Sequence, residues 1–296
     1  MTTVGVVAHA GKTARGGPDE LRRRLADAGA DDPVWLEVQR SADAAPMARR
    51  AVADGVDLLV VWGGDGTVQR CLGAVAGTGV PLAVVPAGTA NLLAANLGLP
   101  RDVAGAVEIA LHGDRRVLDV GSLNGEPFAV VAGAGLDART VAGASSEAKR
   151  RVGRLAYVVS AAQALDVPPV RARVEVDGVE CFTGKVTCVL VGNHPRSAGG
   201  VTVFDGSRPD DGILEVGLAT ARTVAQWVRT AAVVALDDAE ASPFVVTSRG
   251  RTIDVRFDAP VPVELDGSVR EPTDHLHVEV HPGAVTMCVP AAARAG

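Results

Sequence analysis

Two glycine-rich corners between residues 58 and 100 carry the chemical signal of this sequence. The first corner reads Gly63-Gly64-Asp65-Gly66-Thr67 and follows the apolar run 58–62. The second reads Pro86-Ala87-Gly88-Thr89-Ala90-Asn91 and follows the apolar run 82–85. Glycines let the backbone approach a ligand closely, and free amides at a helix start favour an anion. The pattern therefore predicts a site for a phosphorylated small molecule.

The first corner, with Asp65 at its centre, differs in sequence from better-known phosphate-binding loops. A GxGxxG pattern starting at Gly64 would need glycine in place of Gln69, and a Walker pattern around Lys12 would need glycine in place of Val6. A carboxylate repels a bare phosphate, so Asp65 is expected to meet Mg²⁺ or to orient a neighbouring amide or hydroxyl. The alternative interpretation is a tight strand-to-helix turn in which Asp65 caps the helix.

The elements that must position these corners alternate through the first 115 or so residues. Short apolar runs predict strands, and apolar residues at i, i+3, i+4 and i+7 predict helices between them. Strands are expected at 4–8, 34–38, 58–62 and 82–85, and helices at 19–28, 41–53, 68–75, 91–99 and 103–111. Such alternation predicts an α/β domain with a parallel sheet, helices on both faces and a ligand beyond the carboxyl ends of the strands.

The remainder of the chain changes character. Apolar and charged residues alternate over 170–176 and then meet Asp177-Gly178, which is a strong hairpin signal. Further strands are expected at 185–192, 213–219, 251–257, 261–265 and 276–280, with helices near 146–165 and 222–236. This half is predicted to be an antiparallel sandwich or barrel, with a tight domain boundary near Asp119.

Composition narrows the function classes. With 296 residues, of which 47% are hydrophobic and 22% charged, the chain suits one large or two ordinary ordered domains. Its net charge of -6 argues against general nucleic-acid binding, which needs a basic surface. The sequence shows no signal peptide and no apolar run near the ~18 residues of a spanning helix. We therefore expect a soluble, cytoplasmic protein.

The cysteines and histidines show no metal-ligand spacing. The four cysteines have apolar neighbours and are expected to be buried free thiols: Cys71, Cys181, Cys188 and Cys288. The six histidines are expected at surfaces or turns, and His194 is the one that could line a ligand site.

Further motifs follow the two corners in order. They lie at 115–121 (RRVLDVG), 133–137 (GAGLD), 153–157 (GRLAY), 209–216 (PDDGILEV), 265–267 (LDG) and 285–290 (VTMCVP). Together with the corners, this series resembles the diacylglycerol kinase and sphingosine kinase superfamily, above all the bacterial soluble lipid kinases related to diacylglycerol kinase B. The resemblance covers almost the whole chain, whereas the first corner alone is shared with NAD kinases and phosphofructokinases.

The resemblance implies two domains. Residues 1–118, with a C-terminal segment of about 286–296, would form a three-layer α/β nucleotide-binding domain of the NAD kinase and phosphofructokinase type. Residues 119–285 would form an antiparallel β-sandwich that takes the lipid substrate. The implied cofactors are ATP and Mg²⁺.

The resemblance also implies site residues. Those for the nucleotide are Gly63, Gly64, Asp65, Gly66, Thr67, Gly88, Thr89, Asn91, Ser41, Gly11 and Lys12. Asp119 matches a carboxylate that helps to organise Mg²⁺. The side chain of Asp211 and the backbone oxygens of Arg208 and Ile213 match a structural Mg²⁺ site, although 210–212 also has the composition of a plain turn.

Some positions depart from the family pattern. The glutamate of the usual Asp-Gly-Glu is Ser268 here, so Asp266 becomes the candidate base or the residue that orients the acceptor hydroxyl. Leu92 stands where many members have aspartate, and Ala8-His9 replaces the common asparagine-proline. The catalytic candidates are therefore Asp266, Asp65 and Asp119.

The expected function is ATP-dependent phosphorylation of a hydroxyl of diacylglycerol or a related lipid. The open alternatives are an NAD kinase-like enzyme and a nucleotide- or lipid-binding protein with weak or lost kinase activity. The expected partner is a lipid substrate at the membrane surface, reached by peripheral contact. The basic segment 149–154 is interpreted either as a contact with anionic headgroups or as a solvated helix face. A homodimer is also left open.

Overall fold

The computed structural model describes residues 2–135, 168–195, 203–204, 206–234 and 242–291. The chain divides into two compact units: residues 1–120 with 282–296, and residues 121–281. Both unit boundaries fall inside strands, β5 (Asp114–Leu123) and β14 (Ser268–Val289), which pair with each other. The expected helix at 146–165 and the basic segment 149–154 lie outside the described residues.

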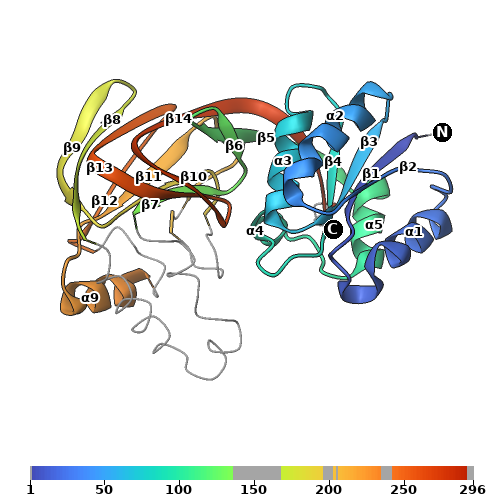
Figure 1. Ribbon diagram of the computed structural model, residues 1–296, viewed down its shortest axis with the longest axis horizontal. Helices are drawn as coiled ribbons and strands as arrows, with labels where there is room; N and C mark the ends of the chain where they lie inside the picture. Colours follow the sequence, from blue (N-terminus) through green and yellow to red (C-terminus); the bar gives the residue numbers. More distant parts are fainter. Residues whose placement is uncertain (1, 136–167, 196–202, 205, 235–241, 292–296) are drawn as a thin grey trace, which may run out of the picture. The chain divides into compact units, whose positions relative to one another are not determined.

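A parallel sheet forms the centre of the first unit, with strand order β4-β3-β1-β2 (Figure 1). Its strands are β1 (Val4–His9), β2 (Val34–Val38), β3 (Leu58–Gly63) and β4 (Leu82–Pro86). The end of β14 joins beside β4, where Met287 pairs with Leu82. All residues of β3 and β4 are buried, as expected for strands covered on both faces.

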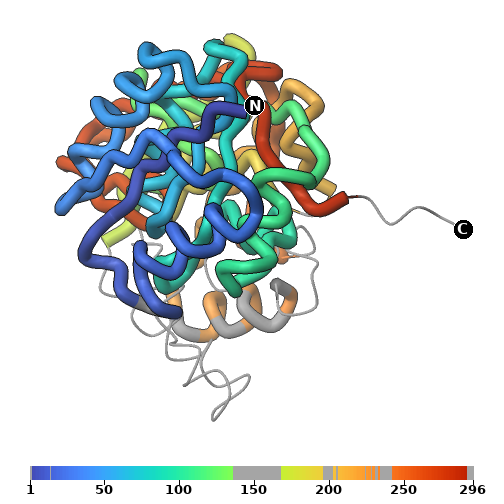
Figure 2. Tube along the Cα trace, turned by 90° about the vertical axis from the view of Figure 1, so that its right-hand side faces the viewer, coloured from blue at the N-terminus to red at the C-terminus, as the bar shows by residue number. Residues whose placement is uncertain are grey.

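Helices cover both faces of this sheet, as Figure 1 shows. Helices α1 (Gly17–Asp27) and α5 (Val103–His112) pack together on one face, where Leu21 and Leu25 meet the side chains of β1 and β3. Figure 2 shows α1 in dark blue beside α5 in green. Helices α2 (Ala44–Ala53) and α3 (Asp65–Val75) pair on the other face. The short elements are η1 (Ala14–Gly16), η2 (Ser41–Asp43) and α4 (Leu92–Asn96).

The parallel register decides where the two corners meet. Gly63 pairs with Pro86, and Ala8 pairs with Trp62. The carboxyl ends of β1, β3 and β4 therefore lie at one edge of the sheet, and α3 and α4 begin there. The predicted α/β fold of this unit is confirmed, because each apolar run forms a strand of that sheet.

The second unit is mostly antiparallel, with strand order β12-β11-β10-β7-β13-β14. Strand β13 also pairs with β8, which forms a hairpin with β9, and β5 pairs with β6. One apolar core fills its interior, with contributions from Val174, Val189, Leu214 and Ile253. The remaining elements are β6 (Glu126–Phe128), β7 (Val131–Gly135), β8 (Val170–Val176), β9 (Val179–Val186), β10 (Cys188–Gly192), β11 (Leu214–Ala219), α9 (Val224–Val234), β12 (Val245–Gly250) and β13 (Thr252–Leu265).

Several expected strands of this unit have different limits. The strand expected at 185–192 is divided at Thr187, whose backbone N–H and hydroxyl both donate to the carbonyl of Ala219. The strands expected at 251–257 and 261–265 form one strand, β13, with a bulge between Arg256 and Val261. The strand expected at 276–280 is likewise part of the single long strand β14, which also takes in most of the motif at 285–290.

The prediction of four buried cysteines is wrong for one of them. Cys71, Cys188 and Cys288 are buried, but Cys181 is exposed. Cys181 lies on β9, which among the described strands pairs with β8 alone, and most residues of β9 are exposed. Among the described residues, no helix has the length and apolar character that crossing a membrane requires.

Candidate functional site

The two glycine corners pack against each other, backbone to backbone. A Cβ atom placed on Gly88 would lie 2.6 Å from the Cα of Gly64, and one placed on Gly64 would lie 3.1 Å from the Cα of Gly88. The amide of Ala87 donates to the carbonyl of Gly63 at 2.8 Å and holds the two turns in register. Glycine is needed at both positions because a side chain would push the corners apart.

Asp65 joins the corners from its place at the start of α3. Its Oδ2 accepts the backbone N–H of Asn91 at 2.8 Å, and its Oδ1 accepts that of Leu92 at 2.5 Å. Burial raises the pKa of Asp65, while these two amides and the Lys12 ammonium act in the opposite direction. Asp65 therefore orients neighbouring amides, and it caps α4, the helix of the other corner, rather than its own.

Asn91 closes the second corner around its tip. Its side-chain Oδ1 accepts the N–H of Gly88, and its Nδ2 donates to the carbonyl of Gly88, both at 2.8 Å. Asn91 has a φ of 52°, in the left-handed region that asparagine tolerates. Thr89 and Ala90 lie between these bonds and are exposed. The loop is thus rigid at its base and presents Thr89 to solvent.

In the first corner, one side chain packs in the interior, and two backbone N–H groups can act as hydrogen-bond donors. Thr67 is fully buried, and its Oγ1 lies 3.1 Å from the Oγ of Ser41, so Thr67 and Ser41 join α3 to η2. The amides of Thr67 and Val68 donate to the carbonyl of Gly64. Within the described residues, no hydrogen bond uses the backbone N–H of Gly64 or Gly66. These two N–H groups can meet an anion at the start of α3.

The loop after β1 brings positive charge to the corners. The buried indole of Trp62 donates to the carbonyl of Lys12 at 2.9 Å, which fixes the loop above β3. The Cε of Lys12 lies 4.0 Å from where a Cβ of Gly64 would be. The amide of Gly11 donates to Nδ1 of His9 at 3.2 Å. Partial burial lowers the pKa of His9, and Lys12 lowers it further.

Arg15 is a residue of this site that the sequence patterns did not identify. Its Nη1 donates to the carbonyl of Pro86 at 2.6 Å, at the entrance of the second corner. The only signal in the sequence was its place before Gly16-Gly17, a pair that marks a loop with positive φ. Arg15 itself has a φ of 55°, and Gly16 one of 90°.

Asp119 is placed separately, on β5 in the first unit. Its side chain is 5% exposed, and its Oδ1 accepts the N–H of Gly283 at 2.8 Å. Gly283 has a φ of 62°, so the backbone of β14 turns locally to bring this amide to the carboxylate. Asp119 thereby ties β5 to the last part of β14.

Asp266, in the second unit, is held by backbone amides. It is 3% exposed, and its carboxylate accepts the N–H groups of Ala129, Val130 and Val131 at 2.7, 2.9 and 3.0 Å. Its own amide donates to the carbonyl of Val131 at 2.9 Å. These three bonds fix the carboxylate against the backbone of the segment 129–131. Asp266 therefore holds the segment 129–131 as a clamp, and its role as the base or as the residue that orients the acceptor hydroxyl stays a prediction.

The neighbouring Ser268 is fixed by a second clamp. Arg270 forms a two-pronged ion pair with Glu126, in which its Nε lies 2.7 Å from Oε2. The Nη1 of Arg270 also donates to the carbonyl of Ser268 at 3.0 Å. The turn 266–268 is thus anchored on both sides to the segment 126–131.

The residues matched to a structural Mg²⁺ site form a turn. The Oδ1 of Asp211 accepts the N–H of Ile213 at 3.1 Å, and Arg208 pairs with Asp210. The alternative turn interpretation accounts for these contacts. The part of the chain that the structure describes contains no group of three His, Cys, Asp or Glu residues arranged for a metal.

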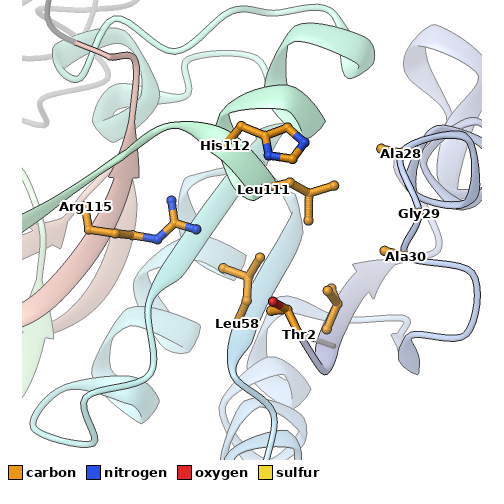
Figure 3. A pocket seen from close by; sticks show the side chains of 9 residues that line it. Thr2, Ala28, Gly29, Ala30, Leu58, Leu111, His112 and Arg115 are labelled. Carbon is orange, nitrogen blue, oxygen red and sulfur yellow. The ribbon is translucent and has the colours of Figure 1, made fainter.

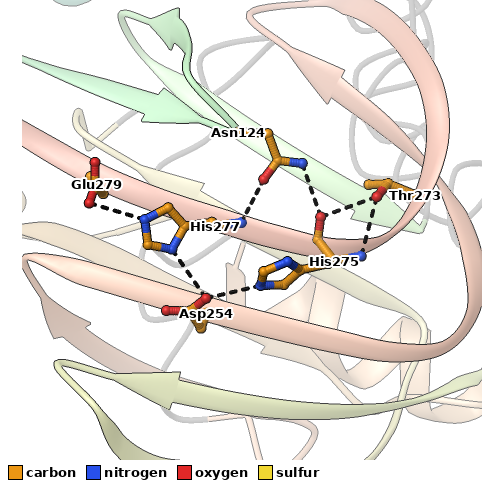
Figure 4. A network of polar contacts seen from close by, with 6 residues as sticks. All are labelled: Asn124, Asp254, Thr273, His275, His277 and Glu279. Carbon is orange, nitrogen blue, oxygen red and sulfur yellow. Dashed lines mark hydrogen bonds and ion pairs between the residues drawn. The ribbon is translucent and has the colours of Figure 1, made fainter.

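A histidine network on β14 was not anticipated from the sequence (Figure 4). Asp254 Oδ1 lies 3.0 Å from Nε2 of His275 and 3.1 Å from Nδ1 of His277. Nε2 of His277 in turn lies 3.0 Å from Glu279. The missed signal was the spacing of two, which places His275, His277 and Glu279 on one face of a strand. His194, expected at a surface or turn, is 4% exposed.

A separate pocket of about 200 Å³ lies away from the corners (Figure 3). It is lined at the amino ends of β1 and β3 by Val4 and Leu58, and at the end of α5 by Leu111, His112 and Arg115. Both Nη atoms of Arg115 already donate to carbonyls at the end of α5. No predicted site residue lines this pocket.

Two family models match consecutive parts of this chain. The model of the diacylglycerol kinase catalytic domain matches residues 6–123. The model of the YegS C-terminal NAD kinase beta sandwich-like domain matches residues 129–289, more than half of the chain. The second match agrees with the antiparallel second unit, and the expected β-sandwich is confirmed.

Several relatives match most of this chain in sequence. A diacylglycerol kinase of Bacillus subtilis is 28% identical over 233 residues, which are 76% of this chain and 75% of that protein. A Shewanella frigidimarina protein named "Probable lipid kinase YegS-like" is 28% identical over 86% of this chain and 84% of its own length. An uncharacterized Synechocystis sp. protein matches over 73% of this chain, which spans 51% of that protein.

Solved structures show the same fold. A diacylglycerol kinase structure from Bacillus anthracis aligns with a TM-score of 0.76 at 23% identity, over 97% of this chain and 96% of that one. An NAD kinase from Archaeoglobus fulgidus in complex with ATP aligns with a TM-score of 0.52 at 13% identity, over 97% of this chain and 93% of that one. The NAD kinase likeness is therefore one of fold.

Proposed function

This chain belongs to the family of diacylglycerol kinases and YegS-like lipid kinases, and from this premise we propose that it transfers the γ-phosphoryl group of ATP to a lipid hydroxyl. The acceptor class is diacylglycerol or a related lipid with a free hydroxyl. The first unit binds the nucleotide, and the second unit binds the lipid.

The contact between Gly64 and Gly88 is the observation that carries this proposal. It brings two helix starts to one sheet edge, with Lys12 beside them. The N–H groups of Gly64 and Gly66 are available to a phosphate, and the exposed Thr89 stands on the neighbouring loop. Donors fixed in this way need no rearrangement to bind a phosphate, so they stabilise charge on a transferred group efficiently.

The residues of the two corners are better suited to binding ATP than to holding a permanently bound magnesium ion. Each oxygen of Asp65 already accepts one backbone amide, so we assign Asp65 to positioning these amides. Magnesium enters with ATP as part of the substrate, and it neutralises phosphate charge when bound. Asp119 stays the predicted carboxylate for that cation.

The roles of the three acidic candidates differ accordingly. Asp65 positions the amides of Asn91 and Leu92, and Asp266 positions the segment 129–131. Phosphoryl transfer depends on alignment and charge neutralisation more than on covalent help from the protein. The proposed transfer therefore does not require Asp266 to act as the proton acceptor.

The decisive experiment is incubation of the full chain with labelled ATP, Mg²⁺ and a panel of lipids, read by chromatography. The panel contains diacylglycerol, monoacylglycerol, ceramide, sphingosine and phosphatidylglycerol, with NAD as the control acceptor. Label in diacylglycerol or another lipid of the panel is the expected result. Label only in NAD would overturn the proposal in favour of an NAD kinase-like enzyme.

A second function follows from the observation that Ser268 replaces the family glutamate while the Asp266 carboxylate accepts three backbone amides. The chain would then bind nucleotide and lipid without turnover. ATP binding in isothermal titration, with no label in any lipid, would favour this function over the kinase.

A further inference from the structure

The backbone around Arg15 adopts an uncommon conformation. Arg15, Gly16 and Gly17 have φ values of 55°, 90° and 69°, three left-handed residues in succession. A non-glycine residue in this region is strained, so it persists only where the surrounding structure holds it. The bond from the Arg15 guanidinium to the carbonyl of Pro86 is such a restraint.

That bond leaves most of the guanidinium available. An arginine carries five N–H donors in a planar fork, and among the described residues Arg15 uses its Nη1 on Pro86. Arg15 is exposed, so the remaining donors face solvent at the entrance of the second corner. A planar fork of this kind suits phosphate oxygens, which it can bind with two parallel hydrogen bonds.

The charges around the corners favour such an anion. Lys12 lies beside Gly64 at the first corner, and Arg15 lies beside Pro86 at the second. The nearby carboxylate, Asp65, already accepts two backbone amides. The loop after β1 therefore places one cation at each corner.

We propose that Arg15 binds a phosphate of the donor nucleotide and makes the site prefer nucleotides with several phosphates. The assignment rests on the proposed function, because it names a contact within the same nucleotide site. Lys12 serves the first corner and Arg15 the second, so a chain of phosphates can engage both cations. A monophosphate reaches one of them, and adenosine reaches neither.

The test is isothermal titration of ATP, ADP, AMP and adenosine into the wild-type chain and into R15Q and R15A. Glutamine can still donate to the carbonyl of Pro86 but carries no charge. We expect R15Q and R15A to weaken ATP and ADP binding about tenfold, the loss of one charge-assisted contact, and to leave adenosine unchanged. The matched control is R49Q, because Arg49 is exposed on α2, and it should bind all four ligands like the wild type.

Three outcomes overturn the assignment. If R15Q binds ATP like the wild type and R15A does not, Arg15 only tethers Pro86. If both variants bind ATP like the wild type, Arg15 has no part in the site while the proposed function stands. If the wild type binds none of the nucleotides, the proposed function fails and the assignment fails with it.

Discussion

The carboxylate of Asp65 accepts the backbone N–H of Leu92, 27 positions later in the chain, so the first residue of one helix caps the next helix. This bond and the one from Asn91 connect the two glycine corners through a single side chain. The position of each corner therefore depends on the other, and a change at Asp65 affects both.

The D65A variant is expected to lose ATP binding and also some stability. Removing the carboxylate leaves two partly buried amides without acceptors, which costs about 1–3 kcal/mol in the free energy of unfolding. The measurement combines nucleotide titration with urea unfolding of the same preparations. A D65A protein with wild-type stability and no ATP binding would instead indicate direct contact between Asp65 and the ligand.

The G88A variant is expected to separate the corners. Its Cβ would lie 2.6 Å from the Cα of Gly64, and backbone cannot yield as a flexible side chain can. We expect ATP affinity to fall at least tenfold, measured by titration. The control is A90S on the exposed tip of the same loop, which adds one atom in solvent and should bind normally. Normal ATP binding by G88A would contradict a site built on close backbone contact.

The D266N variant tests the clamp on 129–131. Asparagine offers one acceptor oxygen where the carboxylate offers two, so an amide loses its partner at a cost of about 2 kcal/mol. Hydrogen exchange of the amides of Ala129, Val130 and Val131 should accelerate relative to the wild type. Unchanged exchange together with abolished lipid phosphorylation would contradict the clamp and support Asp266 as the catalytic base.

The network around His277 predicts a pH dependence of stability. Hydrogen bonds to Asp254 and Glu279 raise the pKa of His277, although partial burial opposes them. The contribution of His277 to the free energy of unfolding is therefore complete below its unfolded pKa of about 6.5. That contribution is lost as the pH rises through the higher pKa of the folded protein. Burial alone would raise the pKa of Asp254, but the bonds from His275 and His277 lower it, so its contribution is lost only at acid pH.

The measurement is the melting temperature of the wild type and H277Q between pH 5 and pH 9. Because the side chain of His277 is 42% exposed, the effect should correspond to less than about 1 kcal/mol. The two melting curves should differ near pH 5.5 and converge above pH 8. A difference that grows toward alkaline pH would contradict the ion pairs.

The parallel sheet could be predicted because its signals are local. The apolar runs of β2 and β3 carry their own strand pattern, and Gly63-Gly64 and Gly88 mark the turns that follow. Because the carboxyl ends of parallel strands lie at the same edge of a sheet, the turns that follow these strands also lie at that edge. The candidate nucleotide residues follow from that edge.

The side-chain partners could not be predicted, because they depend on tertiary register. Asp266 meets amides about 136 positions away, and Arg15 meets a carbonyl 71 positions away. No local pattern encodes such pairs. The limits of β14 could not be predicted for a similar reason. Pro282-Gly283 has the composition of a turn, but the amide of Gly283 donates a hydrogen bond to the distant Asp119.

The first unit is interrupted in sequence by the second, and this has a consequence for biosynthesis. Met287 and Cys288 fill the last place beside β4, yet they are translated after some 160 residues of the other unit. A nascent chain that has released only residues 1–120 lacks this strand and exposes the flank of β4. The first unit can therefore complete its assembly only after the second unit has been translated.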